Sequence, residues 1–157
     1  MALSKLSAVQ FARLDTMASA VLSVDTSGEG FVDITRDVTG FVERIKARDG
    51  AMLVFLKHTS ASLVIQENAD RDVQTDLVTA LERLAPARAG YLHEVEGADD
   101  MPAHIKSMLN GVALHVPVAG GKLMLGAWQG VYVAEHRAAP HRREVVLQFL
   151  GQCEGGI

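Results

Sequence analysis

Several features that define common protein classes are missing from this 157-residue sequence. It has one cysteine, Cys153, so no disulfide can form within the chain, which fits a reducing compartment. Its longest uncharged apolar runs, such as 52–56, are far shorter than the roughly 20 residues that a membrane-spanning helix needs. Its first residues lack the continuous apolar region of a signal peptide. We therefore expect a cytoplasmic protein that has no membrane partner.

Positive charge is also scarce, since the formal net charge is -4 and the chain has one dense basic cluster. That cluster consists of Arg137, His141, Arg142 and Arg143. Nucleic-acid binding depends on clustered Lys and Arg, so we expect no nucleic-acid partner. We interpret 138–143 as a solvated loop, the alternative being a binding patch. A glycine-rich phosphate loop of the Walker or dinucleotide type is missing too, so nucleotide cofactors are not indicated.

What the sequence does contain describes one globular domain. The chain has the usual length of a single domain, and 48% of its residues are hydrophobic and 22% are charged. No internal repeat or low-complexity linker divides it. We predict an N-terminal extension over 1–17 and one domain over 18–157.

Three helices are predicted from apolar residues at helical spacing and from helix-end signals. The first covers about 36–48, and Thr35 is its candidate cap. The second follows the candidate N-cap Asp70 and stops at Pro86. The third covers about 101–110, ahead of a glycine.

Strands account for most of the remaining chain, because short apolar or alternating runs are separated by turn residues. Short glycine-containing turns, such as the one at 120–121, favour antiparallel pairing. We therefore predict an α+β fold with mainly antiparallel strands. These strands cover about 18–25, 30–34, 51–57, 61–67, 112–118, 122–127, 130–136 and 144–150.

The most informative stretch directly follows the buried-strand pattern at 52–56. Its chemistry-bearing residues are His58, Thr59, Ser60, Ser62, Glu67 and Asn68. An imidazole, three hydroxyls, a carboxylate and an amide delivered from a strand to one rim are typical of a site for a polar ligand. The alternative for Glu67 and Asn68 is a polar bend that leads into the Asp70 cap.

A second polar stretch, 126–137, contains the one tryptophan and ends beyond a predicted strand. Trp128 lies near two glycines, so it is either a core residue or, with Gln129 beside it, a platform for a planar ring. Arg137 offers a bidentate fork for a phosphate group. The hydroxyl residues of the first stretch can receive the same anion.

Four of the six histidines, at 58, 93, 104 and 136, lie at predicted strand ends or helix starts, and we expect them to converge in one pocket. Neutral imidazoles with one carboxylate form a catalytic type of metal site, so His93, His104 and His136 are candidate ligands of a divalent cation, zinc or magnesium. Their spacing matches no recognised zinc motif, and a histidine near a helix start can instead cap or hydrogen-bond.

The remaining candidates near these histidines have simpler interpretations as well. One of Asp99 and Asp100 can cap the third helix, which leaves the other to orient a histidine or to hold a metal. His115 is interpreted as a surface or subunit-contact residue, and His141 as a solvated one.

Three ordered motifs resemble the YjbQ-like family, also labelled the secondary thiamine-phosphate synthase family, over about 18–151. The resemblance implies a mixed β-sandwich with outer helices and a homotrimer. The matching pieces are His58-Thr-Ser-Ala-Ser-Leu, Gln66-Glu-Asn-Ala-Asp70, Asp99-Asp-Met-Pro-Ala-His-Ile-Lys106, Leu125-Gly-Ala-Trp-Gln-Gly-Val-Tyr132 and Glu135-His-Arg137.

The resemblance also implies an enzyme that joins a pyrimidine pyrophosphate to a thiazole phosphate with release of pyrophosphate, as a weak side reaction beside a main activity whose substrate the resemblance does not name. A metal-assisted hydrolase or lyase on a different small anionic substrate uses the same residues and is the first alternative. A non-catalytic anion-binding trimer is the second. The catalytic candidates are His58, Glu67, Asp100 and His104, and the substrate-binding candidates are Thr59, Ser60, Ser62, Asn68, Trp128, Gln129 and Arg137.

Overall fold

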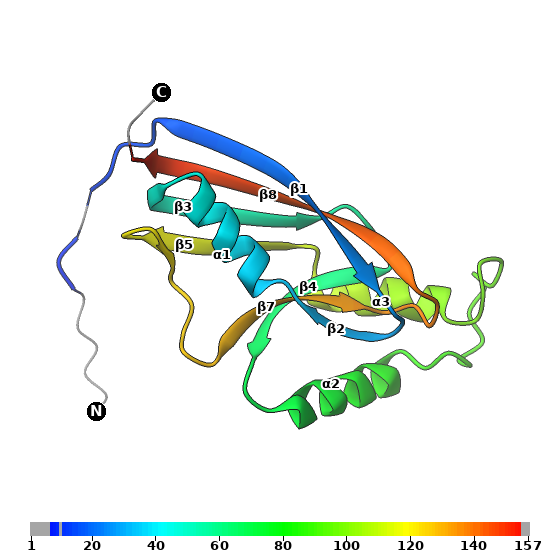
Figure 1. Cartoon of the computed structure of the whole chain (residues 1–157). Helices are drawn as coiled ribbons and strands as arrows, with labels where there is room; N and C mark the ends of the chain where they lie inside the picture. The colour runs from blue at the N-terminus through cyan, green and yellow to red at the C-terminus, as the bar shows by residue number, and fades with distance from the viewer. Residues whose placement is uncertain (1–6, 10, 155–157) are drawn as a thin grey trace.

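A computed structural model describes residues 7–9 and 11–154 of the chain (Figure 1). These residues form eight strands and three helices, which confirms the predicted α+β class. Residues 1–6 and 10 of the expected N-terminal extension, and 155–157 of the expected domain, lie outside the described residues. The helices within the described ranges all fall short of the length and apolar character that a membrane crossing requires.

The strands form two sheets, and every described pair of neighbouring strands is antiparallel. The order in the large sheet is β1 (Thr16–Thr26), β8 (His141–Cys153), β3 (Ala47–Leu56), β5 (Ala113–Ala119) and β6 (Lys122–Leu123). The order in the small sheet is β2 (Gly30–Asp33), β7 (Gln129–Glu135) and β4 (Ala61–Glu67). Figure 1 shows the two sheets as layers, with α1 beside both.

Alternation along the strands builds the core between the sheets. One face of β3 and β8 supplies one wall, and β4 and β7 supply the other. Because consecutive strand residues point to opposite sides, residues such as Phe55 and Leu150 face away from this core and stay exposed. The core residues with the least exposure include Met52, Val54, Leu63, Val131, Val133, Val145 and Phe149.

Helix α1 (Thr35–Arg44) is shorter than the predicted 36–48. Its apolar stripe packs into the core as expected. The helix ends early because Lys46 adopts a left-handed backbone conformation, with φ of 51°, which leads directly into β3. The prediction that Thr35 caps the helix is wrong. Its hydroxyl instead accepts a hydrogen bond from the backbone N–H of Val131 at 2.8 Å and so attaches the helix to β7.

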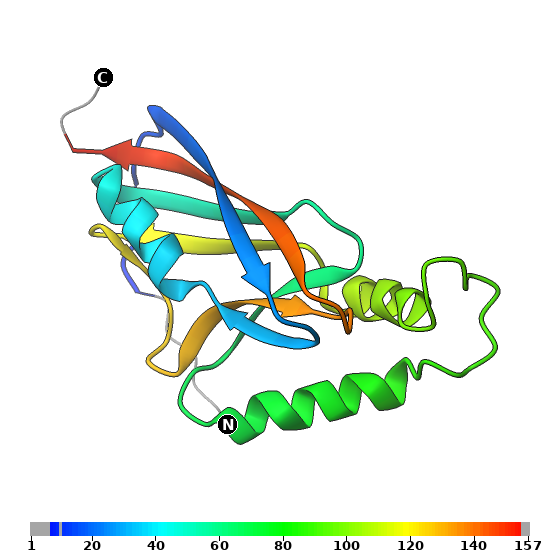
Figure 2. The same ribbon diagram turned by 45° about the vertical axis from the view of Figure 1, so that its right-hand side comes forward.

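Helix α2 (Arg71–Leu84) begins as predicted, since the Asp70 carboxylate accepts a hydrogen bond from the N–H of Asp72 at 2.9 Å. It buries no residue fully, and Figure 2 shows it as the outermost helix. Helix α3 (Asp100–Asn110) packs on β4 and buries Ala103 and Ser107. Gly111, with φ of 87°, ends it.

Two strand predictions need correction. The strand expected at 122–127 is only β6, because the chain leaves the large sheet after Leu123 to reach the small sheet at Gln129. The loop expected at 138–143 ends early, because β8 begins at His141 and pairs with β1 from His141 to Gly151. The solvated environment expected for Arg143 is therefore wrong, since this side chain is 1% exposed.

Arg143 lies between the two sheets and forms a buried ion pair with Glu135 of β7. Its Nε and Nη2 donate to the two carboxylate oxygens at 2.7 and 2.6 Å. The Thr26 hydroxyl donates to the same carboxylate at 2.9 Å, and Arg143 Nη2 also donates to Ser60 Oγ at 3.1 Å. Burial raises the pKa of Glu135, but the hydrogen bonds, chiefly from Arg143, outweigh it and leave the pKa below its ordinary value.

We predict that Arg143→Met destabilises the fold by about 3–5 kcal/mol, because it leaves the Glu135 carboxylate buried without its partner. The control is Arg142→Met, one residue away. Arg142 pairs with Asp25 on the exposed side of the strand, so its loss should leave the free energy of unfolding nearly unchanged. Urea denaturation measures both, and equal effects of the two substitutions would contradict a structural role for the buried pair.

Candidate active site

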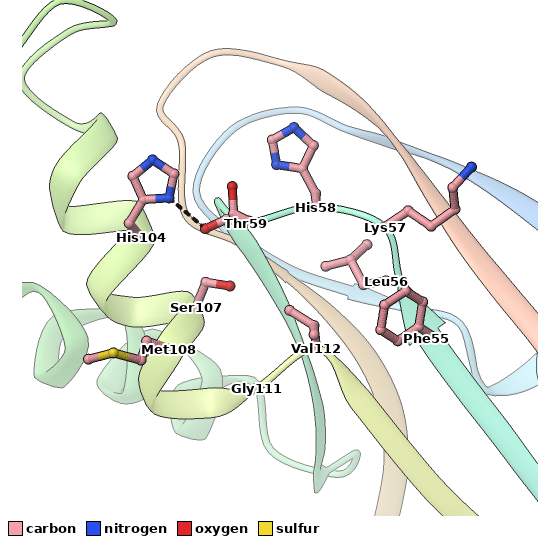
Figure 3. Close-up of a pocket in the computed structure, with 10 residues that line it drawn as sticks. All are labelled: Phe55, Leu56, Lys57, His58, Thr59, His104, Ser107, Met108, Gly111 and Val112. Carbon is pink, nitrogen blue, oxygen red and sulfur yellow. Dashed lines mark hydrogen bonds between the residues drawn. The ribbon is translucent and has the colours of Figure 1, made fainter.

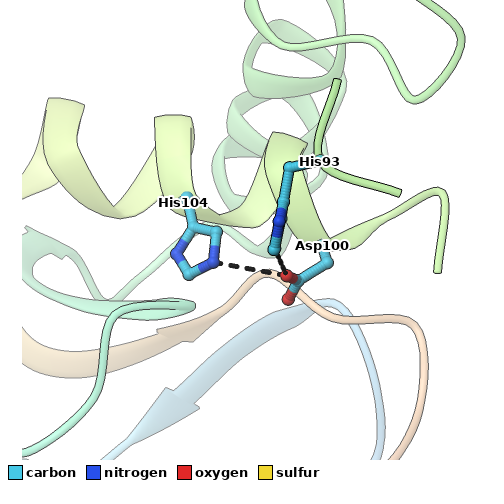
Figure 4. A group of neighbouring side chains, drawn as sticks. All are labelled: His93, Asp100 and His104. Atoms are coloured by element: carbon cyan, nitrogen blue, oxygen red, sulfur yellow. Dashed lines mark hydrogen bonds and ion pairs between the residues drawn. The ribbon is translucent and has the colours of Figure 1, made fainter. Parts of the chain in front are cut away.

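Two histidines and one aspartate meet at the beginning of α3 (Figure 4). His93 Nε2 lies 2.7 Å from Asp100 Oδ2, and His104 Nε2 lies 3.3 Å from the same oxygen. One ligand atom from each of the three residues lies within 4.8 Å of the others. We call His93, Asp100 and His104 the histidine–aspartate group.

Helix geometry and the chain turn after β3 hold this group together. Asp100 and His104 are four residues apart on α3, which places them on one face. The Nδ1–H of His104 donates to the backbone carbonyl of Thr59 at 2.9 Å. Because that carbonyl can only accept, the neutral His104 ring has its unprotonated Nε2 toward Asp100.

Asp100 is buried and is oriented by Arg137, whose Nη1 donates to it. Arg137 also donates through Nε to Asp99 at 3.1 Å and through Nη2 to the carbonyl of Glu96 at 2.7 Å. Three of its five N–H groups are therefore used by the protein. The sequence suggested that Arg137 binds a phosphate group. In the structure its side chain instead contacts Asp99, Asp100 and the carbonyl of Glu96, on the protein side of the histidine–aspartate group.

Asp99 does not cap α3 with its side chain, contrary to the expectation that one aspartate of the pair would do so. Its carboxylate instead accepts hydrogen bonds from Arg137 and from the backbone N–H of Ala138 at 2.9 Å. Burial raises the pKa of Asp99, but these hydrogen bonds outweigh burial and leave the pKa below its ordinary value. Asp99 thus fixes Arg137, which in turn fixes Asp100.

A cavity of about 670 Å³ adjoins the group and shares His104 with it (Figure 3). Figure 3 shows the rings of His58 and His104 on either side of Thr59 at its rim. His58 Nδ1 lies 3.1 Å from both the backbone nitrogen and the Oγ of Ser60. The residues that line the cavity are Phe55, Leu56, Lys57, His58, Thr59, His104, Ser107, Met108, Gly111 and Val112.

His136 lies apart from the histidine–aspartate group, although the sequence suggested it as a third histidine ligand. It is buried, and its Nε2 is 2.8 Å from the Oγ of Ser62. That hydroxyl also accepts from Asn110 at 3.1 Å, so Ser62 is part of the interior rather than of the cavity lining. Burial, and then the charge of the buried Lys106, lower the pKa of His136 to about 4.

Four other candidate residues lie at the opposite end of the small sheet. Antiparallel pairing of β4 with β7 places Ala61 opposite Glu135, and Glu67 opposite Gln129. The six steps from residue 61 to residue 67 span about 20 Å at ~3.3 Å per residue. Glu67, Asn68, Trp128 and Gln129 therefore do not meet His58 within one chain. Trp128 is 69% exposed, which excludes the core alternative for its indole ring.

Sequence reasoning did not identify Arg143 and Glu135 as neighbours of the site. Alternation would have found both, because Arg143 shares its strand face with Val145, and Glu135 shares its face with Val133. On each strand the inward-facing apolar residues are therefore followed by one charged residue, an arginine on β8 and a glutamate on β7, and these two charges are opposite. The cavity walls from α3, such as Met108, had no such signal, since their position depends on how α3 packs against β4.

Fold and site together define an α+β protein with two antiparallel sheets and a histidine–aspartate group at the start of α3. The family model described as UPF0047 protein YjbQ-like matches residues 20–152. A UPF0047 protein of Synechocystis sp. is 44% identical over 133 residues, which cover 84% of this chain and 90% of that one. The UPF0047 protein YjbQ of Salmonella typhimurium is 38% identical over 132 residues, or 83% and 96% of the two chains. The chain therefore belongs to the YjbQ/UPF0047 family, as the motifs predicted.

Solved structures agree with this assignment. A conserved YjbQ/UPF0047-family protein of Clostridium acetobutylicum is 38% identical, has a TM-score of 0.78, and covers 83% of this chain and 98% of its own. A YbjQ-like protein of unknown function from Sulfolobus solfataricus is 25% identical, also with a TM-score of 0.78, and covers 87% and 100%. These similarities establish the family and the fold, and they name no reaction.

The low pKa of His136 predicts a pH dependence of stability. The unfolded chain binds a proton on this histidine near pH 6.5, whereas the folded chain does so only near pH 4. Stability is therefore lost as pH falls from about 6.5 to about 4, by about 3 kcal/mol in total. Urea denaturation between pH 7 and 4 should show that His136→Gln removes this part of the slope. The same dependence of stability on pH in the wild type and in His136→Gln would contradict this prediction. The control is His115→Gln, which changes an exposed histidine.

Proposed function

We propose that the protein is a metal-dependent enzyme that acts on a small organic phosphate or a similar small anion. The observation that carries the proposal is the histidine–aspartate group at the rim of a cavity that His58 also lines. Nitrogen and carboxylate donors from three residues, with space for a substrate beside them, are typical of a catalytic metal site.

The residues present fit a divalent cation. Two imidazole nitrogens and one carboxylate oxygen are a usual ligand set for zinc, whereas magnesium prefers oxygen ligands, so we propose zinc. The hydrogen bonds from His104 to the Thr59 carbonyl and from Arg137 to Asp100 are the outer contacts that orient metal ligands. His93 would exchange its contact with Asp100 for the cation, which the partial exposure of its ring permits. A bound cation supplies a Lewis acid that polarises a phosphoryl oxygen.

The cavity supports a substrate that has an organic part as well as an anionic one. Phe55, Met108 and Val112 provide apolar walls, and the polar groups lie together at the rim with His58 and His104. A ring or chain against these walls would place its phosphate at the histidine–aspartate group. Orientation of this kind is what a group-transfer enzyme needs from its binding site.

Within this class, the family resemblance favours thiamine-phosphate synthesis, which joins a pyrimidine pyrophosphate to a thiazole phosphate with release of pyrophosphate. Hydrolysis of another small phosphate ester uses the same residues. Because Arg137 is bonded to Asp100, we propose that the metal ion and His58, rather than this arginine, stabilise the leaving anion. The remaining alternative is a protein that binds the anion at this site without converting it.

We predict that His104→Ala and Asp100→Asn abolish measurable zinc binding in calorimetry. Arg137→Ala should weaken it by about 10–100-fold, because it only orients Asp100. His115→Ala, at an exposed histidine on β5, should bind zinc like the wild type and serves as the control. The zinc-loaded wild type should then convert either the two thiamine precursors or a simple phosphate ester, and His104→Ala should convert neither.

Two results would contradict this account in different ways. Zinc affinity that survives both His104→Ala and Asp100→Asn would place the metal elsewhere. Zinc binding without turnover of either substrate type would leave a metal-bound anion receptor in place of an enzyme.

We further propose that the outer face of the large sheet mediates self-association, with three copies as the family resemblance implies. Strand register places apolar residues of four strands side by side on this face. One row is Val21, Val146, Phe55 and Ala113, and another is Met17, Leu150, Ala51 and Pro117. These two apolar rows flank a mixed row of Ser19, Gln148, Leu53 and His115, and a surface of apolar rows with interspersed polar residues is typical of a subunit contact. Phe55 also lines the cavity, so a second copy would border the site.

Light scattering should report a trimer for the wild type at micromolar concentration. Val146→Lys, near the middle of the apolar rows, should shift the mass toward the monomer, because a buried unpaired charge opposes association. Leu84→Lys changes an exposed apolar residue on α2, away from this face, and should leave the mass unchanged. A monomeric wild type would exclude the proposed contact.

A further inference from the structure

We propose that Ser60 and Arg143 hold His58 as a neutral imidazole whose Nε2–H donates a hydrogen bond to the substrate anion, so that His58 binds the anion and removes no proton from it. Ser60 and Arg143 are positioning residues in this account. The nature of the anion rests on the proposed function, whereas the state of His58 follows from the hydrogen bonds of the chain itself.

The proton position on His58 follows from the backbone of Ser60. The N–H of Ser60 points at His58 Nδ1, with 3.1 Å between the two nitrogens. A backbone N–H can only donate, so Nδ1 must be the unprotonated, accepting nitrogen. In a neutral imidazole the proton is then on Nε2. Among the described residues, no hydrogen-bond partner occupies this second nitrogen.

Arg143 orients the hydroxyl of the same serine. Its Nη2 donates to Ser60 Oγ at 3.1 Å, and a guanidinium has no accepting atom. The hydroxyl accepts from Arg143 and directs its own proton toward His58 Nδ1, 3.1 Å away. Two donors therefore converge on Nδ1. Glu135 keeps Arg143 in place from the other side.

The same arrangement opposes a positive charge on His58. A proton on Nδ1 would face two donors and lose both hydrogen bonds. Burial lowers the pKa of His58, and the nearby charge of Arg143 lowers it further, while Glu135 acts in the opposite direction. Nδ1 is thus occupied by the protein, and the one proton of the neutral ring is on the nitrogen that the protein leaves open.

This state decides which role His58 can take. A general base needs an unprotonated nitrogen in reach of the substrate, and the unprotonated Nδ1 faces Ser60. A donor needs the Nε2–H, which lies at the tip of the ring at the cavity rim, near His104. His58 therefore complements the histidine–aspartate group as a neutral donor beside the proposed cation site, where developing negative charge would be stabilised.

Nitrogen-15 NMR of histidine-labelled, metal-free full-length protein at pH 7 tests the tautomer without any ligand. We expect an unprotonated Nδ1 and a protonated Nε2 on His58. The double variant Glu135→Gln/Arg143→Met, which removes the buried pair as a unit, should introduce the second tautomer or the charged ring. Thr26→Val, which removes one hydrogen bond to Glu135 without touching Ser60, should leave the His58 signals unchanged. A protonated Nδ1 in the wild type would overturn the proposal. Identical His58 signals in a folded double variant would overturn the positioning role of Arg143 and leave the Ser60 backbone N–H as the group that sets the tautomer.

Calorimetry of inorganic pyrophosphate with the zinc-loaded protein tests the donor role. The amide nitrogen of His58→Gln lies close to the position of Nε2, whereas that of His58→Asn lies close to Nδ1. We expect His58→Gln to bind pyrophosphate within about threefold of the wild type, and His58→Asn and His58→Ala to lose at least about tenfold, as for one charge-assisted hydrogen bond. Equal affinity of His58→Ala and wild type would overturn the donor role. The expected tautomer in a protein that binds no pyrophosphate would contradict the proposed function and the anion-binding half of this proposal, while the positioning by Ser60 would stand.

Discussion

The buried pair of Arg143 and Glu135 is the interaction on which the other parts of this structure depend. The guanidinium comes from β8 in the large sheet and the carboxylate from β7 in the small sheet, so the pair connects the two layers across the end of the core. Removing two charges from water is costly, and only a nearly complete set of hydrogen bonds offsets the cost. Thr26 and Ser60 complete that set, and no buried side-chain polar atom in the described part of the chain lacks a partner.

This arrangement extends from the core to the surface in two directions. Through Ser60, Arg143 reaches His58 at the cavity rim. Through the chain that follows Glu135, it reaches Arg137, whose backbone N–H donates to the Glu135 carboxylate at 3.0 Å and whose side chain holds Asp100. The cavity rim and the histidine–aspartate group are thus positioned from one buried carboxylate. Preorganisation of this kind is what electrostatic catalysis requires, and within the histidine–aspartate group His93 is the residue that comes from a loop, the one between α2 and α3.

Local patterns in the sequence predicted much of the fold, because alternation and helix caps act over a few residues. The strand 61–67 and the Asp70 cap show this, as both occur where they were expected. Errors arose where contacts between distant segments decide the outcome. The hydroxyl of Thr35 bonds to β7 instead of capping its own helix. Arg143 lies three residues after Pro140 in an apparently polar stretch, and it points inward because the pairing of β8 with β1 extends as far as His141.

The candidate site shows the same division. The motifs of the sequence contain His58, Asp100 and His104, which the fold brings together around one cavity, and His93 joins their group of ligand atoms from outside the motifs. They also contain Glu67 and Trp128, which the antiparallel register of β4 and β7 places at the far end of the small sheet. A motif states which residues matter together in a family, whereas strand register decides which of them are neighbours in one chain.

The proposed metal ion at the histidine–aspartate group can be tested directly by crystallography. Crystals grown with zinc and measured at wavelengths on both sides of the zinc absorption edge locate the ion by its anomalous scattering. The account predicts one strong anomalous peak about 2.0–2.2 Å from His93 Nε2, His104 Nε2 and an oxygen of Asp100. A peak at another histidine, such as His115 or His141, with none between these three side chains would contradict it.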